Sequence, residues 1–108
     1  MTWIVETYSE AVDAEIADLS ADILAKLARF RRKIETHGPT SLPMPHARYL
    51  GDGLWELRLS GRDGIARVIY VTVFEKRVIL LRAFVKKTQK TPPREIALAK
   101  QRMRMMML

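Results

Sequence analysis

LWELRLSGRDGIARVIYVTVFEKRVILLRAFVKKTQKTPP, which runs from Leu54 to Pro93, is the stretch of this 108-residue chain that decides its fold. It contains three apolar runs, Leu54–Leu59, Ile65–Phe74 and Val78–Val85. The β-branched and aromatic residues that favour strands are frequent in these runs. The two breaks between the runs are short and polar, which is typical of hairpin turns. The stretch therefore predicts a three-stranded antiparallel meander.

Basic side chains recur along the same stretch. They are Arg58, Arg67, Arg82, Lys86, Lys87 and Lys90. Side chains alternate between the faces of a strand, so Arg67 is predicted to share its face with Ile69 and Val71. If helices cover the other side of the sheet, Arg58 and Arg67 can converge on a solvent-facing side. Arginine and lysine suit a phosphate and the charge that develops on it in a transition state. The alternative is a solvated sheet face, whose arginines pair with Glu56, Asp63 and Glu75.

Two helices are predicted before this stretch, after a short first strand at Trp3–Glu6. Ser9 and Ser20 are suited to be their N-caps, because a serine oxygen can accept a hydrogen bond from the first helical turn. Apolar residues then recur at helical spacing in two stripes. The stripes are Val12, Ile16 and Leu19, then Ile23, Leu27, Phe30 and Ile34. Gly38 ends the second helix, so the two helices form a hairpin.

The second predicted helix is basic in its last half. The basic residues are Arg29, Arg31, Arg32 and Lys33. Cations near a helix C-terminus are favourable by about 0.3–1 kcal/mol each, so helix stability explains much of this run. A binding role for these side chains is the alternative.

The remaining segments complete an α+β order. A proline-rich loop leads to a short edge strand at Ala47–Leu50, and the Asp52-Gly53 dipeptide predicts a hairpin into the meander. After the meander, Thr91 is predicted as an N-cap and Pro92 as the first helical residue. The apolar face of this last helix is Ile96, Ala99, Met103 and Met106. The apolar segment 103–108 that closes the chain is expected to pack on the sheet, and a partner that binds it is the alternative. The predicted fold is a small antiparallel sheet with an N-terminal helical hairpin on one face and a C-terminal helix.

Length and composition predict a single domain over residues 1–108. Apolar residues make up 48% and charged residues 29%, as in ordinary soluble proteins. The absence of cysteine excludes disulfides and fits a reducing compartment. The first residues do not resemble a secretory signal, and no apolar run approaches the roughly 18 residues of a membrane span. A cytoplasmic protein that does not enter a membrane is expected.

The net charge of +7 is unevenly distributed along the chain. Residues 1–28 carry six acidic side chains and one basic side chain, whereas residues 29–108 carry 18 basic and six acidic ones. This asymmetry indicates one face that suits a polyanion, with nucleic acid as the first candidate. A solvated basic surface that keeps the protein soluble is the alternative.

Several common chemistries do not fit the sequence. The Gly51–Gly53 segment lacks the spacing of a phosphate-binding loop. The two histidines, His37 and His46, have no cysteine or carboxylate at a metal-ligand spacing, so neither a metal nor another cofactor is expected. No Ser-His-Asp pattern is visible. Glu56 lies among arginines and is interpreted as an ion-pair partner.

Three segments carry a resemblance to a known family: LWELR (54–58), RVIY (67–70) and FVKKTQKTPPREIALAKQR (84–102). Together they resemble the RelE/HigB superfamily of toxins, in its phage-derived HigB-like branch. The resemblance covers residues 54–102, and the predicted N-terminal strand and helical hairpin agree with the family's order of elements. It implies a RelE-like fold and a type II toxin–antitoxin toxin that cleaves mRNA on the ribosome. It also implies a cognate helix-turn-helix antitoxin as a partner.

The resemblance further implies roles for individual residues. Arg58 and Arg67 fall where superfamily members place basic catalytic residues, and Lys86 or Lys87 falls where another basic group lies. We therefore assign catalysis to Arg58, Arg67 and Lys87. The residues assigned to RNA binding are Arg62, Arg82, Lys86 and Lys90. A ribose 2′-hydroxyl would attack its own 3′-phosphate without a metal ion and leave a 2′,3′-cyclic phosphate, while the ribosome aligns the substrate.

Two departures from the family pattern leave the general acid and base unassigned. Many relatives carry histidine where this chain has Arg82, and no tyrosine lies near the C-terminus. Two alternative functions stay open. One is a ParE-like toxin that inhibits DNA gyrase, and the other is an inactive phage-derived accessory protein.

Overall fold

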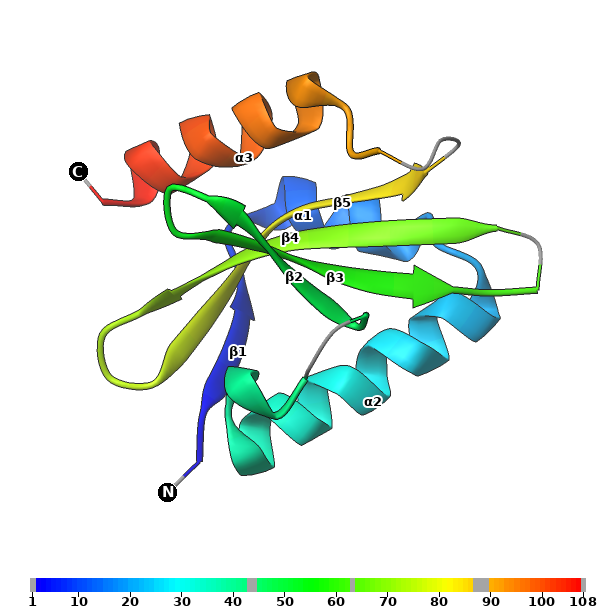
Figure 1. The fold of residues 1–108 in the computed structure, drawn as a ribbon, viewed down its shortest axis with the longest axis horizontal. Helices are drawn as coiled ribbons and strands as arrows, with labels where there is room; N and C mark the ends of the chain where they lie inside the picture. The colour runs from blue at the N-terminus through cyan, green and yellow to red at the C-terminus, as the bar shows by residue number, and fades with distance from the viewer. Residues whose placement is uncertain (1, 43–44, 63, 87–89, 108) are drawn as a thin grey trace.

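The structure is a computed structural model that describes residues 2–42, 45–62, 64–86 and 90–107. Within these ranges five strands form one sheet in the order β1-β5-β4-β3-β2 (Figure 1). The strands are β1 Ile4–Thr7, β2 Ala47–Gly51, β3 Leu54–Ser60, β4 Ile65–Val73 and β5 Arg77–Lys86. The helices are α1 Glu10–Ala17, α2 Ala21–His37 and α3 Pro93–Met106, with a 3₁₀ turn, η1, at Pro39–Ser41. None of these helices is long and apolar enough to cross a membrane.

The predicted meander is confirmed, because β3, β4 and β5 pair antiparallel in sequence order. The predicted edge strand is confirmed as β2, which forms a hairpin with β3. The turn of this hairpin places Gly51, Asp52 and Gly53 at φ values of 103°, 55° and 85°. Glycine adopts this left-handed region freely, and aspartate tolerates it better than most residues. The Gly-Asp-Gly sequence therefore allows the left-handed backbone conformation that the turn requires.

The first strand pairs in a way that the sequence did not predict. β1 lies parallel to β5 at the edge of the sheet, with Ile4 opposite Arg77 and Thr7 opposite Leu80. The sheet is therefore antiparallel except at β1. Two chain segments so far apart in sequence come together only when the sheet assembles.

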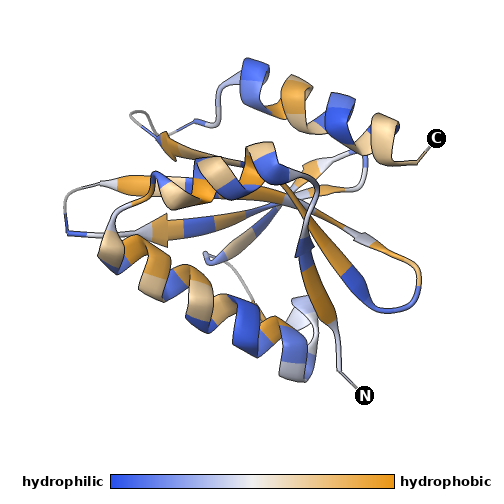
Figure 2. Cartoon of the chain, turned by 180° about the vertical axis from the view of Figure 1, so that it is seen from behind, coloured by the Kyte–Doolittle hydropathy of each residue, from blue (hydrophilic) through white to orange (hydrophobic). Residues whose placement is uncertain are grey.

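Helices cover both faces of the sheet, with α2 and α3 on opposite sides (Figure 1). The larger core lies against α1 and α2 and includes Val68 and Tyr70 of β4. The smaller core lies against α3 and includes Ile69 and Val71 of the same strand. Figure 2 shows apolar colour along the central strands, which these two cores enclose. The apolar face of α3 packs on the sheet, as predicted.

Helix starts follow the predicted positions at α1 and α2 but not at α3. Ser9 and Ser20 are the N-caps of α1 and α2, although neither side chain makes a capping hydrogen bond with the described residues. The N-cap of α3 is Pro92, one residue later than predicted. The Thr91 hydroxyl instead donates a hydrogen bond of 2.5 Å to Glu56 Oε2. The Thr91 hydroxyl, which was expected to cap the helix, thus donates its hydrogen bond to the buried Glu56 carboxylate instead.

The turn between β3 and β4 is anchored to the start of α2 by Asp22. Its carboxylate accepts hydrogen bonds from the Ser20 hydroxyl at 2.7 Å and from the backbone amides of Ile23 and Arg62. A Cβ on Gly61 would lie 2.7 Å from Asp22 Oδ2, so a residue without a side chain allows this close approach. The hydrogen bond from Ser20, followed by that from the Arg62 amide, lowers the pKa of Asp22 to about 2.

The Asp22→Asn variant is expected to lose part of the acid sensitivity of folding. The pKa of Asp22 is lower in the folded chain than the roughly 3.9 of an unfolded aspartate. Its ionised form therefore stabilises the fold above about pH 4, and this contribution is lost as the pH falls towards 2. Urea unfolding between pH 5 and pH 2 should show a steeper loss of stability in the wild type than in Asp22→Asn. The matched control is Asp18→Asn, at an exposed position, and it should follow the wild type; parallel curves for all three proteins would contradict the anchor.

Candidate functional site

The ends of β3 and β5 and the beginning of α3 lie on the same side of the molecule (Figure 1). The two strand ends carry basic residues, Arg58 on β3 and Lys86 on β5. Arg58 of β3 is directly opposite Arg67 of β4, so the two side chains share one face of the sheet. Lys86 at the end of β5 is opposite Ile65, two residues before Arg67. We call Arg58, Arg67 and Lys86 the cationic cluster. The structure thus brings together two predicted catalytic residues and one predicted RNA-binding residue.

One buried carboxylate, that of Glu56, accompanies the cationic cluster. Glu56 is 2% exposed and Arg67 is 3% exposed. Arg67 Nε lies 3.8 Å from Glu56 Oε1, and Arg67 Nη1 donates a 3.1 Å hydrogen bond to the Ala66 carbonyl. Arg67 Nε has no hydrogen-bond partner in the described part of the chain. Glu56 is therefore an ion-pair partner, as predicted, and Arg67 keeps a donor that the surrounding described residues do not use.

The electrostatics of the cationic cluster are unfavourable without an anion. Burial lowers the pKa of Arg67, and the charge of Arg58 lowers it further, while Glu56 acts in the opposite direction. Burial also lowers the pKa of Lys86, followed by the charge of Arg67, against the opposing effect of Glu56. Like charges directly opposite in a sheet are destabilising. The three cations of the cluster are accompanied by one carboxylate, that of Glu56, so the largely buried cluster carries a net positive charge.

The expectation that Arg67 faces solvent is wrong. Arg67 does lie on the face of Ile69 and Val71, as alternation predicted, but α3 packs on that face of the sheet. The face opposite the helical hairpin is therefore partly covered. Because Arg67 is buried, replacing it alone with alanine would change both stability and function, and the two effects would not be separated.

Arg82 is held at the edge of β5 by two carboxylates. The pairing of this edge with β1 ends at Leu80, and no other strand of the described residues pairs with it beyond that point. Arg82 lies 2.9 Å from Glu15 of α1 and 2.8 Å from Glu95 of α3. Arg102 of α3 also binds Glu15, at 2.8 Å. These contacts connect α1 to α3 across β5, so Arg82 has a structural role. The RNA-binding role assigned to Arg82 from the sequence stays a prediction.

Glu15 shows how strongly this edge favours ion pairs. Burial alone would raise the pKa of the Glu15 carboxyl group. Hydrogen bonds from Arg102 and from the Ala83 amide, together with the charge of Arg82, outweigh burial and lower its pKa. The carboxylate is therefore held in its charged form between the two arginines.

The other predicted site residues lie around the cationic cluster or outside the described structure. Arg62 is exposed in the turn between β3 and β4, and Lys90 is exposed shortly before α3. Lys87 falls outside the described residues. The roles assigned to these three residues stay predictions.

A groove lies between α2 and β3 and meets the cationic cluster at Arg58. Its volume is about 370 Å³. It is lined by Lys26, Arg29, Phe30, Lys33, His46, Arg58 and Ser60, and we call it the α2–β3 groove. The sequence prediction missed Lys26 and His46. The spacing of Lys26, Arg29 and Lys33 at i, i+3 and i+7 was the available signal, because it places the three on one helical face.

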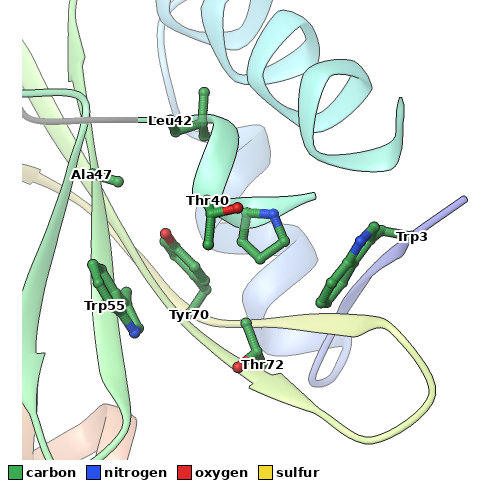
Figure 3. Close-up of a pocket in the computed structure, with 8 residues that line it drawn as sticks. Trp3, Thr40, Leu42, Ala47, Trp55, Tyr70 and Thr72 are labelled. Carbon is green, nitrogen blue, oxygen red and sulfur yellow. The ribbon is translucent and has the colours of Figure 1, made fainter. Parts of the chain in front are cut away.

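A second, larger cleft of about 450 Å³ opens beside the N-terminal strand (Figure 3). Its described lining is Trp3, Pro39, Thr40, Leu42, Ala47, Trp55, Tyr70 and Thr72. None of these side chains is charged at neutral pH, and burial raises the pKa of Tyr70 to about 12. This cleft therefore offers no counter-charge for a phosphate, and Tyr70 belongs to the larger core.

The chemistry available at the cationic cluster is that of cations and hydrogen-bond donors. In the parts of the chain that the structure describes, no three histidine, cysteine or carboxylate residues are placed to hold a metal ion. Guanidinium groups bind phosphate oxygens in a planar fork, and ammonium groups bind them as point charges. Such groups stabilise negative charge that develops during a reaction. The arrangement suits a phosphodiester.

Comparisons with known proteins agree with this fold. The chain matches the sequence profile of a family described as "Phage derived protein Gp49-like (DUF891)" over residues 14–104. It is also similar to a chain in the crystal structure of the archaeal RelE-RelB complex from Pyrococcus horikoshii OT3, with a TM-score of 0.55 and 21% identity. That match covers 79% of this chain and 96% of the other, and it shows a shared fold. A search of curated proteins found no match. The predicted RelE-like α+β fold is thus confirmed.

Proposed function

Because this chain belongs to the phage-derived Gp49-like family and has a RelE-like fold, we propose that it is the toxin of a type II toxin–antitoxin system and cleaves mRNA on the ribosome. The observation that carries this proposal is the pair of arginines, Arg58 and Arg67, opposite one another on adjacent strands. Such a pair is destabilising in a sheet, and the single Glu56 carboxylate balances only part of the charge of the cationic cluster. A phosphate of the RNA backbone would relieve the repulsion.

In the proposed reaction, the ribose 2′-hydroxyl attacks the adjacent 3′-phosphate. A phosphorus–O2′ bond forms and the phosphorus–O5′ bond breaks, which leaves a 2′,3′-cyclic phosphate and a 5′-hydroxyl end. The proton of the attacking 2′-hydroxyl passes to solvent water. Arg58 and Arg67 stabilise the charge that develops on the phosphate oxygens. Lys86 lies opposite Ile65, on the face of the sheet that carries Arg67, and it donates a proton to the leaving 5′-oxygen. Burial lowers its pKa, which is in keeping with this role. Lys87 is the second candidate for this step.

Glu56 and Thr91 are positioning residues in this proposal. The Glu56 carboxylate lies beside Arg67 and accepts the Thr91 hydrogen bond, so it holds the guanidinium in place. Thr91 also ties the start of α3 to β3. A positioned guanidinium loses less entropy when it binds a phosphate, which contributes to the rate.

Two kinds of partner follow from the proposal. The ribosome in the cytoplasm presents the mRNA and aligns its scissile phosphate, so a small set of cations is sufficient for cleavage. A cognate helix-turn-helix antitoxin neutralises the toxin by covering the cationic cluster with acidic side chains. In the similar solved structure, the RelE chain is found in a complex with RelB.

The proposal is tested by controlled expression of the protein, followed by mapping of new RNA 5′ ends in the same cells. Growth arrest with new 5′-hydroxyl ends inside coding regions is the expected result. A reporter mRNA without a start codon is the control, and it should remain intact because the ribosome does not translate it. Arrest with intact mRNA and damaged DNA would indicate a gyrase inhibitor instead. Normal growth with soluble, folded protein would indicate an inactive accessory protein.

A further inference from the structure

We infer that the α2–β3 groove binds a single-stranded RNA segment that continues from the scissile phosphate at the cationic cluster. This inference rests on the proposed function, because the cluster must first hold RNA. Arg58 belongs both to the cluster and to the lining of the groove. Its backbone amide donates a 2.8 Å hydrogen bond to the His46 carbonyl, which holds these two lining residues side by side.

The groove has uncompensated positive charge. In the described part of the chain, none of its four cations, Lys26, Arg29, Lys33 and Arg58, forms an ion pair. Other cations of the protein are paired, for example Arg77 with Glu6 at 2.6 Å. Cations that line one hollow without carboxylates attract a polyanion to it.

The cations of α2 form a row rather than a point. Lys26, Arg29 and Lys33 lie at i, i+3 and i+7, on one face of the helix. At 1.5 Å per residue, the row is about 10 Å long. A row of this kind follows a chain of phosphates, whereas a single phosphate would need only one or two of its members.

Two aromatic rings in the groove favour single-stranded RNA over an acidic protein segment. The Phe30 and His46 rings lie 5.3 Å apart, inclined by 55°, and both line the groove. Proteins that bind single-stranded nucleic acid combine a basic groove with aromatic side chains on which bases stack. An acidic peptide would use the cations but would gain little from these rings.

The charge contribution is tested with the purified full chain and a fluorescent 2′-O-methyl RNA of about ten nucleotides, which spans a typical single-strand site. This RNA lacks the attacking hydroxyl, so binding is measured without cleavage. A plot of log affinity against log salt concentration has a negative slope for RNA binding. Arg29→Gln and Lys33→Gln should each make this slope shallower by about 0.7. Arg32→Gln is the matched control: it removes the same charge from an exposed position of α2 outside the groove. An equal change in Arg32→Gln would overturn the inference.

The stacking contribution is tested with Phe30→Leu, which keeps an apolar side chain against the larger core. Loss of one base–aromatic contact should weaken RNA binding about tenfold, with the thermal midpoint measured in parallel to confirm folding. Duplex DNA should bind less tightly than the RNA, because its bases are not free to stack on the rings. Unchanged RNA affinity in folded Phe30→Leu, or equally tight binding of duplex DNA or polyglutamate, would overturn the inference.

Cleavage assays separate this inference from the proposed function. Weaker RNA binding in the groove variants, together with a wild-type protein that cleaves nothing, would support the groove and refute the nuclease. Wild-type cleavage with RNA binding and cleavage unchanged in all groove variants would support the nuclease and refute the groove.

Discussion

The Arg58→Gln variant is expected to lose cleavage activity by about 10²–10³-fold, as when one electrostatic donor is removed from a transition state. Glutamine keeps much of the side-chain stem but removes the charge opposite Arg67. Because like charges opposite one another destabilise a sheet, the free energy of unfolding should rise by roughly 0.2–1 kcal/mol. Loss of activity together with a gain of stability is the mark of a residue kept for function.

The measurement combines two assays on the same preparations: the rate of mRNA cleavage in a translating extract and urea unfolding. Arg32→Gln is again the control, because it is exposed on α2 and lies outside both the cationic cluster and the α2–β3 groove. It should leave the cleavage rate and the stability close to those of the wild type. Wild-type cleavage in Arg58→Gln, or unfolding of this variant, would refute the assigned role.

The Glu56→Ala variant is expected to be destabilised by about 3–5 kcal/mol, the usual effect of removing one partner from a buried ion pair. Glu56 is the carboxylate that opposes the lowering of the pKa of both Arg67 and Lys86. Its removal leaves Arg67 buried without that counter-charge and Thr91 without its hydrogen-bond acceptor. Urea unfolding measures the effect. Glu10→Ala, at the exposed start of α1, is the control and should change stability by no more than about 1 kcal/mol.

A double variant separates the structural role of this pair from its chemical role. Glu56→Leu combined with Arg67→Met removes both charges, and such replacements are often neutral or stabilising. Most of the stability lost in Glu56→Ala should therefore return. Cleavage by the double variant should be about 10²–10³-fold slower than in the wild type, because one phosphate-binding guanidinium is gone. A stable double variant that still cleaves mRNA would show that Arg67 takes no part in the reaction. Glu56→Ala with wild-type stability would show that the buried pair contributes little.

Local patterns in the sequence were sufficient for most of the elements. The three predicted runs of the meander differ from β3, β4 and β5 by at most one residue at either end. The two apolar stripes predicted the helical hairpin, and the stripe that includes Ala99 predicted which face of α3 is buried. Alternation along β4 placed Arg67 correctly on the side of Ile69. These predictions succeeded because the period of side chains along a helix or strand depends only on neighbouring residues.

What surrounds each face was decided by the tertiary structure. The placement of β1 beside β5, the packing of α3 near Arg67, and the approach of Thr91 to Glu56 all join segments that are distant in sequence. The sequence by itself determined which residues share a face and that the chain carries excess positive charge. Which cations remain uncompensated, at the cationic cluster and in the α2–β3 groove, was settled only when the helices packed on the sheet, because burial and pairing depend on neighbours that periodicity does not specify.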